Sequence, residues 1–176
     1  MKEKALFLDR DGIINVDYSY VYEIEKFQFN EGIFDLLHLF IKKGYKLFVV
    51  TNQSGIGRDY YSEEAFLHLT DYMLEAFQKE NIFIEKVAYC PHSPETHCTC
   101  RKPATGMIDS ILLDYFIDVE ASWMIGDKQS DIDLAINANI GQSIAIGTKK
   151  IRNSSFSFES IIECKAYLER NKDKIE

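Results

Sequence analysis

Two aspartates stand at the end of an apolar stretch near the start of the chain. The segment ALFLDRDG places Asp9 and Asp11 after four apolar residues, and a third acid, Asp127, ends SWMIGD. If these strands are neighbours, the three carboxylates meet at one sheet edge and repel one another, so a bound cation is the simplest way to keep them ionised. Oxygen ligands with room for water and phosphate suit Mg²⁺. Taken alone, DRDG reads equally well as a turn.

A second group of reactive side chains lies in CPHSPETHCTCRKP. It supplies Cys90, His92, Cys98 and Cys100 in the spacing C-x-H-x5-C-x-C. Three thiolates and one imidazole suit tetrahedral Zn²⁺, and four protein ligands leave no open position, so we expect a structural site. His97 is the rival imidazole, although it directly precedes Cys98 and would be cramped. Reduced cysteines without metal are the alternative.

Two cations, Arg101 and Lys102, follow the last of these cysteines. A zinc ion would fix a loop that has little apolar content, and would thereby hold both cations over the site. Arginine can bind a second phosphate or a cluster of hydroxyls through its fork of donors. Cys164 lies among apolar residues of a late helix and is expected in the core.

Composition narrows the class of protein. The chain has 176 residues, enough for one substantial core, and a formal charge of −8, which disfavours non-specific nucleic-acid binding. No apolar run approaches the roughly 20 residues of a membrane span, and the start of the chain lacks a signal-peptide pattern. We therefore expect a cytoplasmic protein, whose cysteines stay reduced, so that clustered cysteines indicate metal rather than disulfide.

Strand-like and helix-like segments alternate along the chain. This alternation predicts an α/β fold, with a mostly parallel sheet and helices on both faces, in a single domain over 1–176 with a zinc loop at about 90–103. Ligands in such folds bind beyond the carboxyl ends of the strands. The expected strands are 5–8, 46–51, 86–90, 122–127 and 143–146, and the expected helices are 32–43, 63–80, 105–116, 131–138 and 159–169.

Three details of this prediction concern local structure. Ser62 is expected to cap the second helix, whose inward residues would include Ala65, Leu69, Tyr72, Leu74 and Phe77. The last six residues are expected to fray. The aromatic segment 15–29 is either an edge hairpin packed on the core or a flap over the substrate, and no insertion is large enough for a cap domain.

The motifs resemble, in order, those of the haloacid dehalogenase (HAD) superfamily of phosphatases. FLDRDG is similar to that family's first motif, hhhDxDG, and VVTN to the second. RKP stands where the lysine of the third is expected, and MIGDKQSD is similar to the fourth. These matches span 5–131, and the resemblance implies a Rossmann-like HAD fold.

The resemblance also implies roles for individual residues. Asp9 would attack phosphorus and form an aspartyl-phosphate, while Asp11 would protonate the leaving oxygen and later take a proton from water. Mg²⁺ would be held by the carboxylates of Asp9 and Asp127 and the backbone carbonyl of Asp11. Thr51 and Lys102 would donate to the phosphoryl oxygens.

Two related subfamilies carry such a zinc loop: one removes the 7-phosphate of D-glycero-D-manno-heptose 1,7-bisphosphate, and the other hydrolyses histidinol phosphate. The chain resembles the first in DGIINVDYSYVYEIEKFQF, TNQSGIGR and RKPATGM, although Gly57 and Asp59 depart from its usual G-I-A-R-G. The resemblance implies a monomeric, Mg²⁺-dependent sugar-bisphosphate phosphatase of surface-polysaccharide or lipopolysaccharide-core synthesis, without nucleic-acid or membrane partners. The substrate contacts would be Asp17, Tyr20, Val21, Asn52, Gln53, Ser54, Arg101 and Lys128.

Three alternatives stay open at this point. A phosphatase for histidinol phosphate or another small sugar phosphate would share every catalytic motif. A receiver domain also combines a parallel sheet, clustered acids, a threonine and a lysine, but its phosphorylated aspartate would end the third strand, where Cys90 stands. A catalytically silent, zinc-stabilised binding module would tolerate neutralisation of Asp11.

Overall fold

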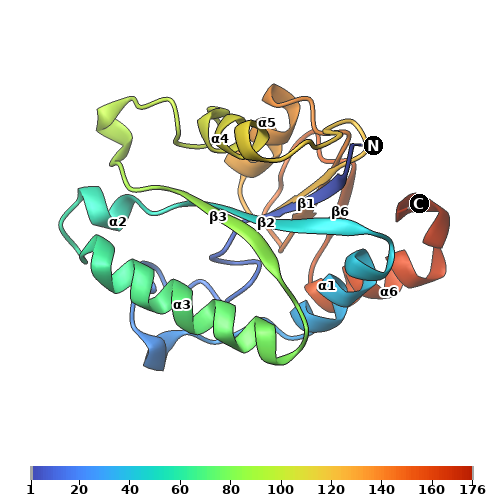
Figure 1. Cartoon of the computed structure of the whole chain (residues 1–176), viewed down its shortest axis with the longest axis horizontal. Coiled ribbons are helices and arrows are strands. Elements are labelled where there is room, and N and C mark those ends of the chain that lie inside the picture. Colours follow the sequence, from blue (N-terminus) through green and yellow to red (C-terminus); the bar gives the residue numbers. More distant parts are fainter. Residues whose placement is uncertain (1, 176) are drawn as a thin grey trace.

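A parallel sheet of six strands forms the centre of the computed structural model, which describes residues 2–175 (Figure 1). The strands lie in the order β3-β2-β1-β4-β5-β6, and every neighbouring pair is parallel. They are Lys4–Leu8 (β1), Tyr45–Asn52 (β2), Ile84–Cys90 (β3), Trp123–Gly126 (β4), Gln142–Ile146 (β5) and Phe156–Phe158 (β6).

Helices cover both faces of the sheet, as Figure 1 shows. One face carries α1 (Ile33–Lys42), α3 (Glu63–Lys79) and α6 (Ile161–Arg170), and the other carries α4 (Gly106–Asp114) and α5 (Gln129–Asn137). A short helix, α2 (Ser54–Gly57), follows β2, and 3₁₀ turns form at Ile24–Lys26, Pro94–Thr96 and Lys172–Ile175. The predicted α/β architecture with helices on both faces is confirmed.

Side-chain alternation along β1 divides the core into two layers. Leu6 and Leu8 pack with the apolar side chains of α1, α3 and α6, whereas Ala5 and Phe7 pack with those of α4 and α5. All four side chains are fully buried, because successive residues of a strand face opposite sides of the sheet and both sides are covered. β1 is therefore covered on both faces, and only Lys4, at its amino end, is partly exposed.

The strand order determines where a ligand can bind. β1 pairs with β2 on one side and with β4 on the other, with Leu8 opposite both Val49 and Ile125. The chain runs outward from β1 in both directions, so the crevice at its carboxyl end is the topological switch point of the sheet. Asp9, Thr51 and Asp127 come from these three strand ends.

The segment 15–29 is not the edge hairpin considered above. Its first and last residues touch through a single isolated bridge, Asn15 to Phe29, and a 3₁₀ turn lies between them. Phe27 is buried in the core under α1 and α3, whereas Tyr18 and Tyr20 are exposed. The segment is thus anchored through buried Asn15, Val21 and Phe27, and residues 17–20 lie at the surface.

Several local predictions hold and others are wrong. The Ser62 hydroxyl accepts a hydrogen bond from the Ala65 amide, which confirms the helix cap. The inward face of α3 was partly misjudged: Tyr72 is exposed and Ala65 and Leu74 are only partly buried, while Phe66 and Met73 are fully buried. The true stripe runs through 66, 69, 70, 73 and 77, so three of the five predicted positions, 65, 72 and 74, are one residue away from it.

The end of the chain also differs from the prediction. Residues 171–175 do not fray, since Lys172–Ile175 form a 3₁₀ turn and Ile175 is fully buried against the core. Glu176 lies outside the described residues. β6 was not predicted because its sequence, FSF, is short and lies in a serine-rich stretch. Over residues 2–175, no helix combines the length and apolar character needed to cross a membrane.

Candidate active site

Three carboxylates converge where β1 and β4 end. Asp9 follows β1, Asp127 follows β4, and Asp131 lies in the first turn of α5; one oxygen of each lies within 4.8 Å of the others. Asp9 and Asp131 are buried, and the Asp127 Oδ1 atom is buried without a hydrogen-bond partner. Asp131 was not among the predicted site residues, although it belongs to the quoted motif MIGDKQSD.

Electrostatics at this cluster favour a bound cation. Burial raises the pKa of Asp9 to about 7, with Lys102 opposing the rise and Asp131 adding to it. Burial likewise raises the pKa of Asp127. A divalent cation would stabilise the ionised carboxylates and satisfy the unpartnered Asp127 oxygen. The donors are all oxygens, so the site fits Mg²⁺ better than a thiolate-preferring metal.

Gly12 permits the carboxylates to approach so closely. Its φ angle of +91° lies in the region that favours glycine, and a Cβ atom there would collide with the Asp127 carboxylate. The glycine of DRDG is therefore required both by the turn after β1 and by the space that Asp127 occupies.

Lys102 is buried among the acids. Its Nζ atom lies 2.9 Å from Asp9 Oδ1 and 2.7 Å from Asp131 Oδ1, and it donates to the Val50 carbonyl at 2.8 Å. The ammonium thus contacts three oxygens with its three hydrogens. The Asn52 side chain holds the Lys102 backbone, accepting from its N–H at 2.9 Å and donating to its carbonyl at 3.3 Å.

Asp11 has a different environment. Its Oδ1 accepts from Arg10 Nη2 at 2.8 Å and from Asn15 Nδ2 at 3.1 Å, and its Oδ2 accepts from Gln53 Nε2 at 3.0 Å. Burial alone would raise the pKa of Asp11, but the Arg10 charge and these hydrogen bonds outweigh it and lower that pKa below its usual value. The two aspartates of DRDG therefore differ in the way that two distinct chemical roles require.

Arg10, between the two aspartates, is a residue that sequence reasoning missed. It is 1% exposed, and its Nη2 atom donates to the Val21 carbonyl at 2.6 Å as well as to Asp11. The guanidinium carbon lies 5.6 Å from the centre of the Phe66 ring, within the range of a cation–π interaction. Arg10 thereby fastens the segment 15–29 to Asp11. The only sequence signal was a charged residue where the chain should be buried.

A cleft of about 300 Å³ opens beside Asp11. Lys128 and Asp17 lie on its rim, with Lys128 Nζ 3.4 Å from Asp17 Oδ2, and the Arg101 side chain lines it as well. Val21 does not line the cleft, because its side chain is buried and its carbonyl is bound by Arg10. The other seven predicted substrate contacts do: Asp17, Tyr20, Asn52, Gln53, Ser54, Arg101 and Lys128.

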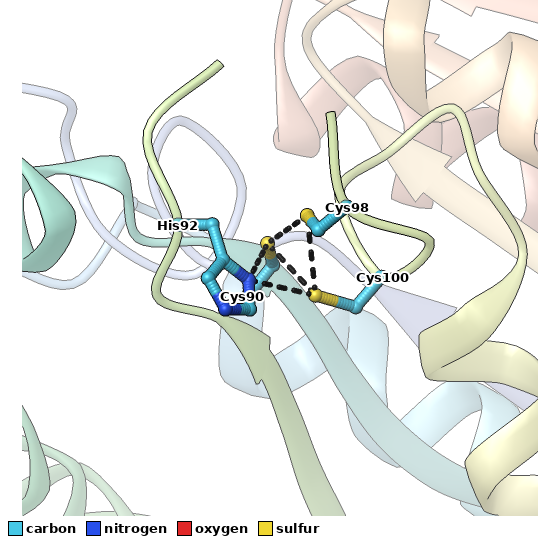
Figure 2. Close-up of side chains that lie close together, drawn as sticks. All are labelled: Cys90, His92, Cys98 and Cys100. Atoms are coloured by element: carbon cyan, nitrogen blue, oxygen red, sulfur yellow. Dashed lines mark hydrogen bonds between the residues drawn. The ribbon is translucent and has the colours of Figure 1, made fainter. Parts of the chain in front are cut away.

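The predicted zinc ligands converge at the end of β3 (Figure 2). The three sulfurs are 3.1–3.5 Å apart, and His92 Nδ1 lies 3.2 Å from Cys100 Sγ and 3.5 Å from Cys90 Sγ. These spacings are near the edge of a tetrahedron with Zn–S bonds of about 2.3 Å, and far above an S–S bond of about 2 Å. The chemistry and geometry of the four donors therefore fit zinc. His97 is outside this group.

The cysteine cluster is joined to the cleft through backbone hydrogen bonds. The Gln53 amide donates to the Cys90 carbonyl, and the Gly57 amide donates to the Pro91 carbonyl, both at 2.8 Å. Arg101 and Lys102 directly follow Cys100 in the chain. A metal at the cluster would thus hold the strand end that supports α2 and the two cations of the site.

Comparison with known proteins agrees with this geometry. A family model described as HAD-hydrolase-like matches residues 99–157. A Campylobacter jejuni protein named D-glycero-alpha-D-manno-heptose-1,7-bisphosphate 7-phosphatase is 47% identical over 156 residues, which cover 89% of this chain and 90% of that protein. This chain belongs to the heptose-1,7-bisphosphate 7-phosphatase family of HAD hydrolases.

Other members of this phosphatase family carry either anomer in their names. A Helicobacter pylori protein named for the beta anomer is 44% identical, over 94% of each chain. A Burkholderia mallei protein named for the alpha anomer is 46% identical, over 83% of this chain and 81% of that protein. Sequence identity therefore does not choose between the anomers.

Solved structures share the fold of this family member. A putative HAD-like phosphatase from Mesorhizobium loti superposes with a TM-score of 0.82 at 27% identity, over 96% of this chain and 87% of that one. The D,D-heptose 1,7-bisphosphate phosphatase of B. bronchiseptica, complexed with magnesium and phosphate, gives 0.83 at 22% identity, over 96% and 99%. The predicted HAD fold is confirmed.

Proposed function

We propose that this chain hydrolyses D-glycero-D-manno-heptose 1,7-bisphosphate to the heptose 1-phosphate and inorganic phosphate. The observation that carries the proposal is the convergence of Asp9, Asp127 and Lys102 beside a differently polarised Asp11. Relatives named for this activity match most of the chain, with an identity of 42–47%. A receiver domain would carry its phosphorylated aspartate at the end of the third strand, where this chain has Cys90.

In the first step Asp9 attacks phosphorus. A bond forms between a carboxylate oxygen and phosphorus, and the bond from phosphorus to the C7 oxygen of the sugar breaks as Asp11 gives that oxygen a proton. The Asp9 Oδ1 atom accepts from Lys102 Nζ and from the Arg10 amide, each at 2.9 Å, which fixes the plane of the carboxylate for attack. The product is an aspartyl-phosphate.

In the second step a water molecule attacks the same phosphorus. Asp11 takes the proton of that water, and the bond between phosphorus and Asp9 breaks, releasing phosphate. The Arg10 charge and the hydrogen bonds that lower the pKa of Asp11 keep it ionised in the free protein, which is the form that can accept this proton. For the first step the same group must carry a proton, and the negative charge of a bound phosphate would favour that form.

The remaining groups bind and position the substrate. Thr51 is buried at the end of β2, and its hydroxyl would donate to a phosphoryl oxygen. The Lys102 ammonium would donate to another by exchanging one of its present contacts with Asp9 and Asp131. Arg101 and Lys128 would contact the sugar or its second phosphate in the cleft, and segment 15–29 would form one wall of it.

Two metal ions complete the proposal. The carboxylates of Asp9 and Asp127 and the Asp11 carbonyl would hold Mg²⁺, which when bound offsets negative charge on the phosphoryl group. Zn²⁺ at the cysteine cluster would be structural, because four protein ligands leave no open position. Cytoplasmic location, a monomeric state and a role in surface-polysaccharide or lipopolysaccharide synthesis stay predictions.

The decisive experiment compares substrates side by side. Both heptose 1,7-bisphosphate anomers, fructose 1,6-bisphosphate and histidinol phosphate are assayed for phosphate release with Mg²⁺. We expect one heptose anomer to give the highest kcat/KM, and Asp9→Asn to abolish release from every substrate. If histidinol phosphate exceeds both heptose anomers by more than about tenfold, equivalent to about 1.4 kcal/mol, the substrate assignment is wrong. Phosphate release that survives Asp9→Asn would refute the mechanism.

A further inference from the structure

A chain of three side chains ends on Asp11. The Tyr61 hydroxyl donates to Gln53 Oε1 at 2.6 Å, and Gln53 Nε2 donates to Asp11 Oδ2 at 3.0 Å and to Thr51 Oγ1 at 2.8 Å. Gln53 is only 2% exposed, although sequence reasoning placed it among the substrate contacts. Both ends of its amide are already engaged within the protein.

The partners of Gln53 determine which way its amide faces. A carboxylate only accepts hydrogen bonds, so the –NH₂ group must face Asp11, and the oxygen then faces the Tyr61 hydroxyl. Burial raises the pKa of Tyr61 to about 12, which keeps its hydroxyl protonated as a donor. Without the Tyr61 donor, the buried Gln53 oxygen would have no hydrogen-bond partner. The orientation of the Gln53 amide that faces its –NH₂ group toward Asp11 would then be less strongly favoured over the flipped one.

Tyr61 itself is held firmly. Its ring stacks on Tyr22, with centroids 4.9 Å apart and planes at 13°, and it is 8% exposed. Gly55 of α2 leaves the space that the ring fills, because a Cβ atom there would collide with Tyr61. A rigid aromatic residue at the rim of the cleft is thus connected to the acid–base residue through one amide.

We propose that Tyr61 is a positioning residue which, through Gln53, aims the Asp11 Oδ2 atom at the leaving oxygen of the substrate. The inference rests on the proposed phosphatase function. Proton donation matters most when the leaving oxygen is a basic alkoxide, as in a sugar phosphate, and matters little for a stabilised nitrophenolate. A positioning defect should therefore depend on the leaving group, whereas a general structural defect should not.

The test measures phosphoryl transfer to the enzyme in single turnovers, with heptose 1,7-bisphosphate and with 4-nitrophenyl phosphate. General acid catalysis is worth roughly 10²–10⁴-fold, so we expect Tyr61→Phe to slow the sugar reaction by about tenfold or more and the nitrophenyl reaction by less than about threefold. Tyr60→Phe is the matched control: Tyr60 is 53% exposed and its ring meets Tyr20 edge-on. It should leave the ratio of the two rates as in the wild type.

A second variant keeps the proposal testable if Tyr61→Phe folds poorly. Gln53→Met removes all three side-chain hydrogen bonds of Gln53, to Tyr61, Asp11 and Thr51, with little change in volume, and should lower the same ratio at least as far. Because the residues act through one chain, the double variant should be no slower than Gln53→Met alone. Equal slowing of both substrates, or additive effects, would overturn the proposal. Failure of the wild type to transfer phosphate from either substrate would instead contradict the proposed function.

Discussion

Replacing Lys102 with methionine should destabilise the protein far more than removing an exposed ion pair of similar length. Lys102 and its two partners, Asp9 and Asp131, are almost completely buried, with side-chain exposures of 2%, 5% and 0%. Methionine fills a similar space but leaves both carboxylates without their cation. Breaking a buried ion pair by removing one partner costs about 3–5 kcal/mol, because the remaining charge stays in the protein interior.

The expected change in melting temperature follows from the size of the chain. For a domain of 150–250 residues, 1 kcal/mol shifts Tm by about 2–4 °C, so the loss should be about 6–20 °C. Lys46→Met is the control, since Lys46 pairs with Glu85 at 2.8 Å while the two side chains are 42% and 28% exposed. Exposed pairs contribute about 0–1 kcal/mol, so that variant should melt within a few degrees of the wild type.

Urea unfolding in magnesium-free buffer at pH 8 would give the free energy of unfolding of both variants, provided that the m-value is unchanged. The loss in Lys102→Met should shrink at pH 5. Burial already raises the pKa of Asp9 to about 7 with Lys102 present, and without the lysine it should rise further, so Asp9 is neutral at pH 5. If the two lysine variants differ by less than about 1 kcal/mol at pH 8, the stabilising role assigned to the buried pair is refuted.

Two further predictions concern the metal sites. Burial raises the pKa of Asp9 from 3.8 to about 7 in the folded protein, so its ionised carboxylate destabilises the metal-free protein increasingly between pH 4 and 8. Mg²⁺ should therefore raise Tm more at pH 8 than at pH 5. An equal rise in Tm at both pH values, or a rise that persists unchanged in Asp9→Asn, would contradict this prediction. Elemental analysis should show that Cys100→Ser has lost its bound zinc, and kcat should fall, because Arg101 and Lys102 directly follow that ligand. Cys164→Ala, in the core beneath α6, is the control and should retain the metal. A wild-type zinc content in Cys100→Ser would exclude the proposed ligand set.

The sequence predicted the parts of the site that depend on strand ends. Apolar runs that stop at Asp9, Thr51 and Asp127 indicate buried strands with polar ends, and the parallel arrangement brings those ends together. The cysteine spacing likewise indicated its own cluster, because the ligands lie close in the chain. Both inferences needed only local pattern and one rule of topology.

Residues whose role depends on tertiary packing could not be predicted in the same way. Asp131 reaches the site because the first turn of α5 packs against the end of β4, where Gly126 leaves room for its side chain. Gln53 looked like a substrate contact because of its neighbours in the chain, but Tyr61, eight residues on, binds its amide oxygen. Neither contact is visible in spacing or hydrophobic pattern.

One side chain, Arg10, donates hydrogen bonds to both Asp11 and the Val21 carbonyl. This shared contact links substrate preference and reaction rate, two properties that evolution would otherwise adjust separately. A change in segment 15–29 that moves Val21 would also move Arg10, which contacts Asp11, the proposed proton-transferring group, so altered substrate preference would come with an altered rate. Diversification of substrate range in such enzymes should therefore concentrate on exposed positions such as Tyr18 and Tyr20, and leave the backbone at residue 21 in place.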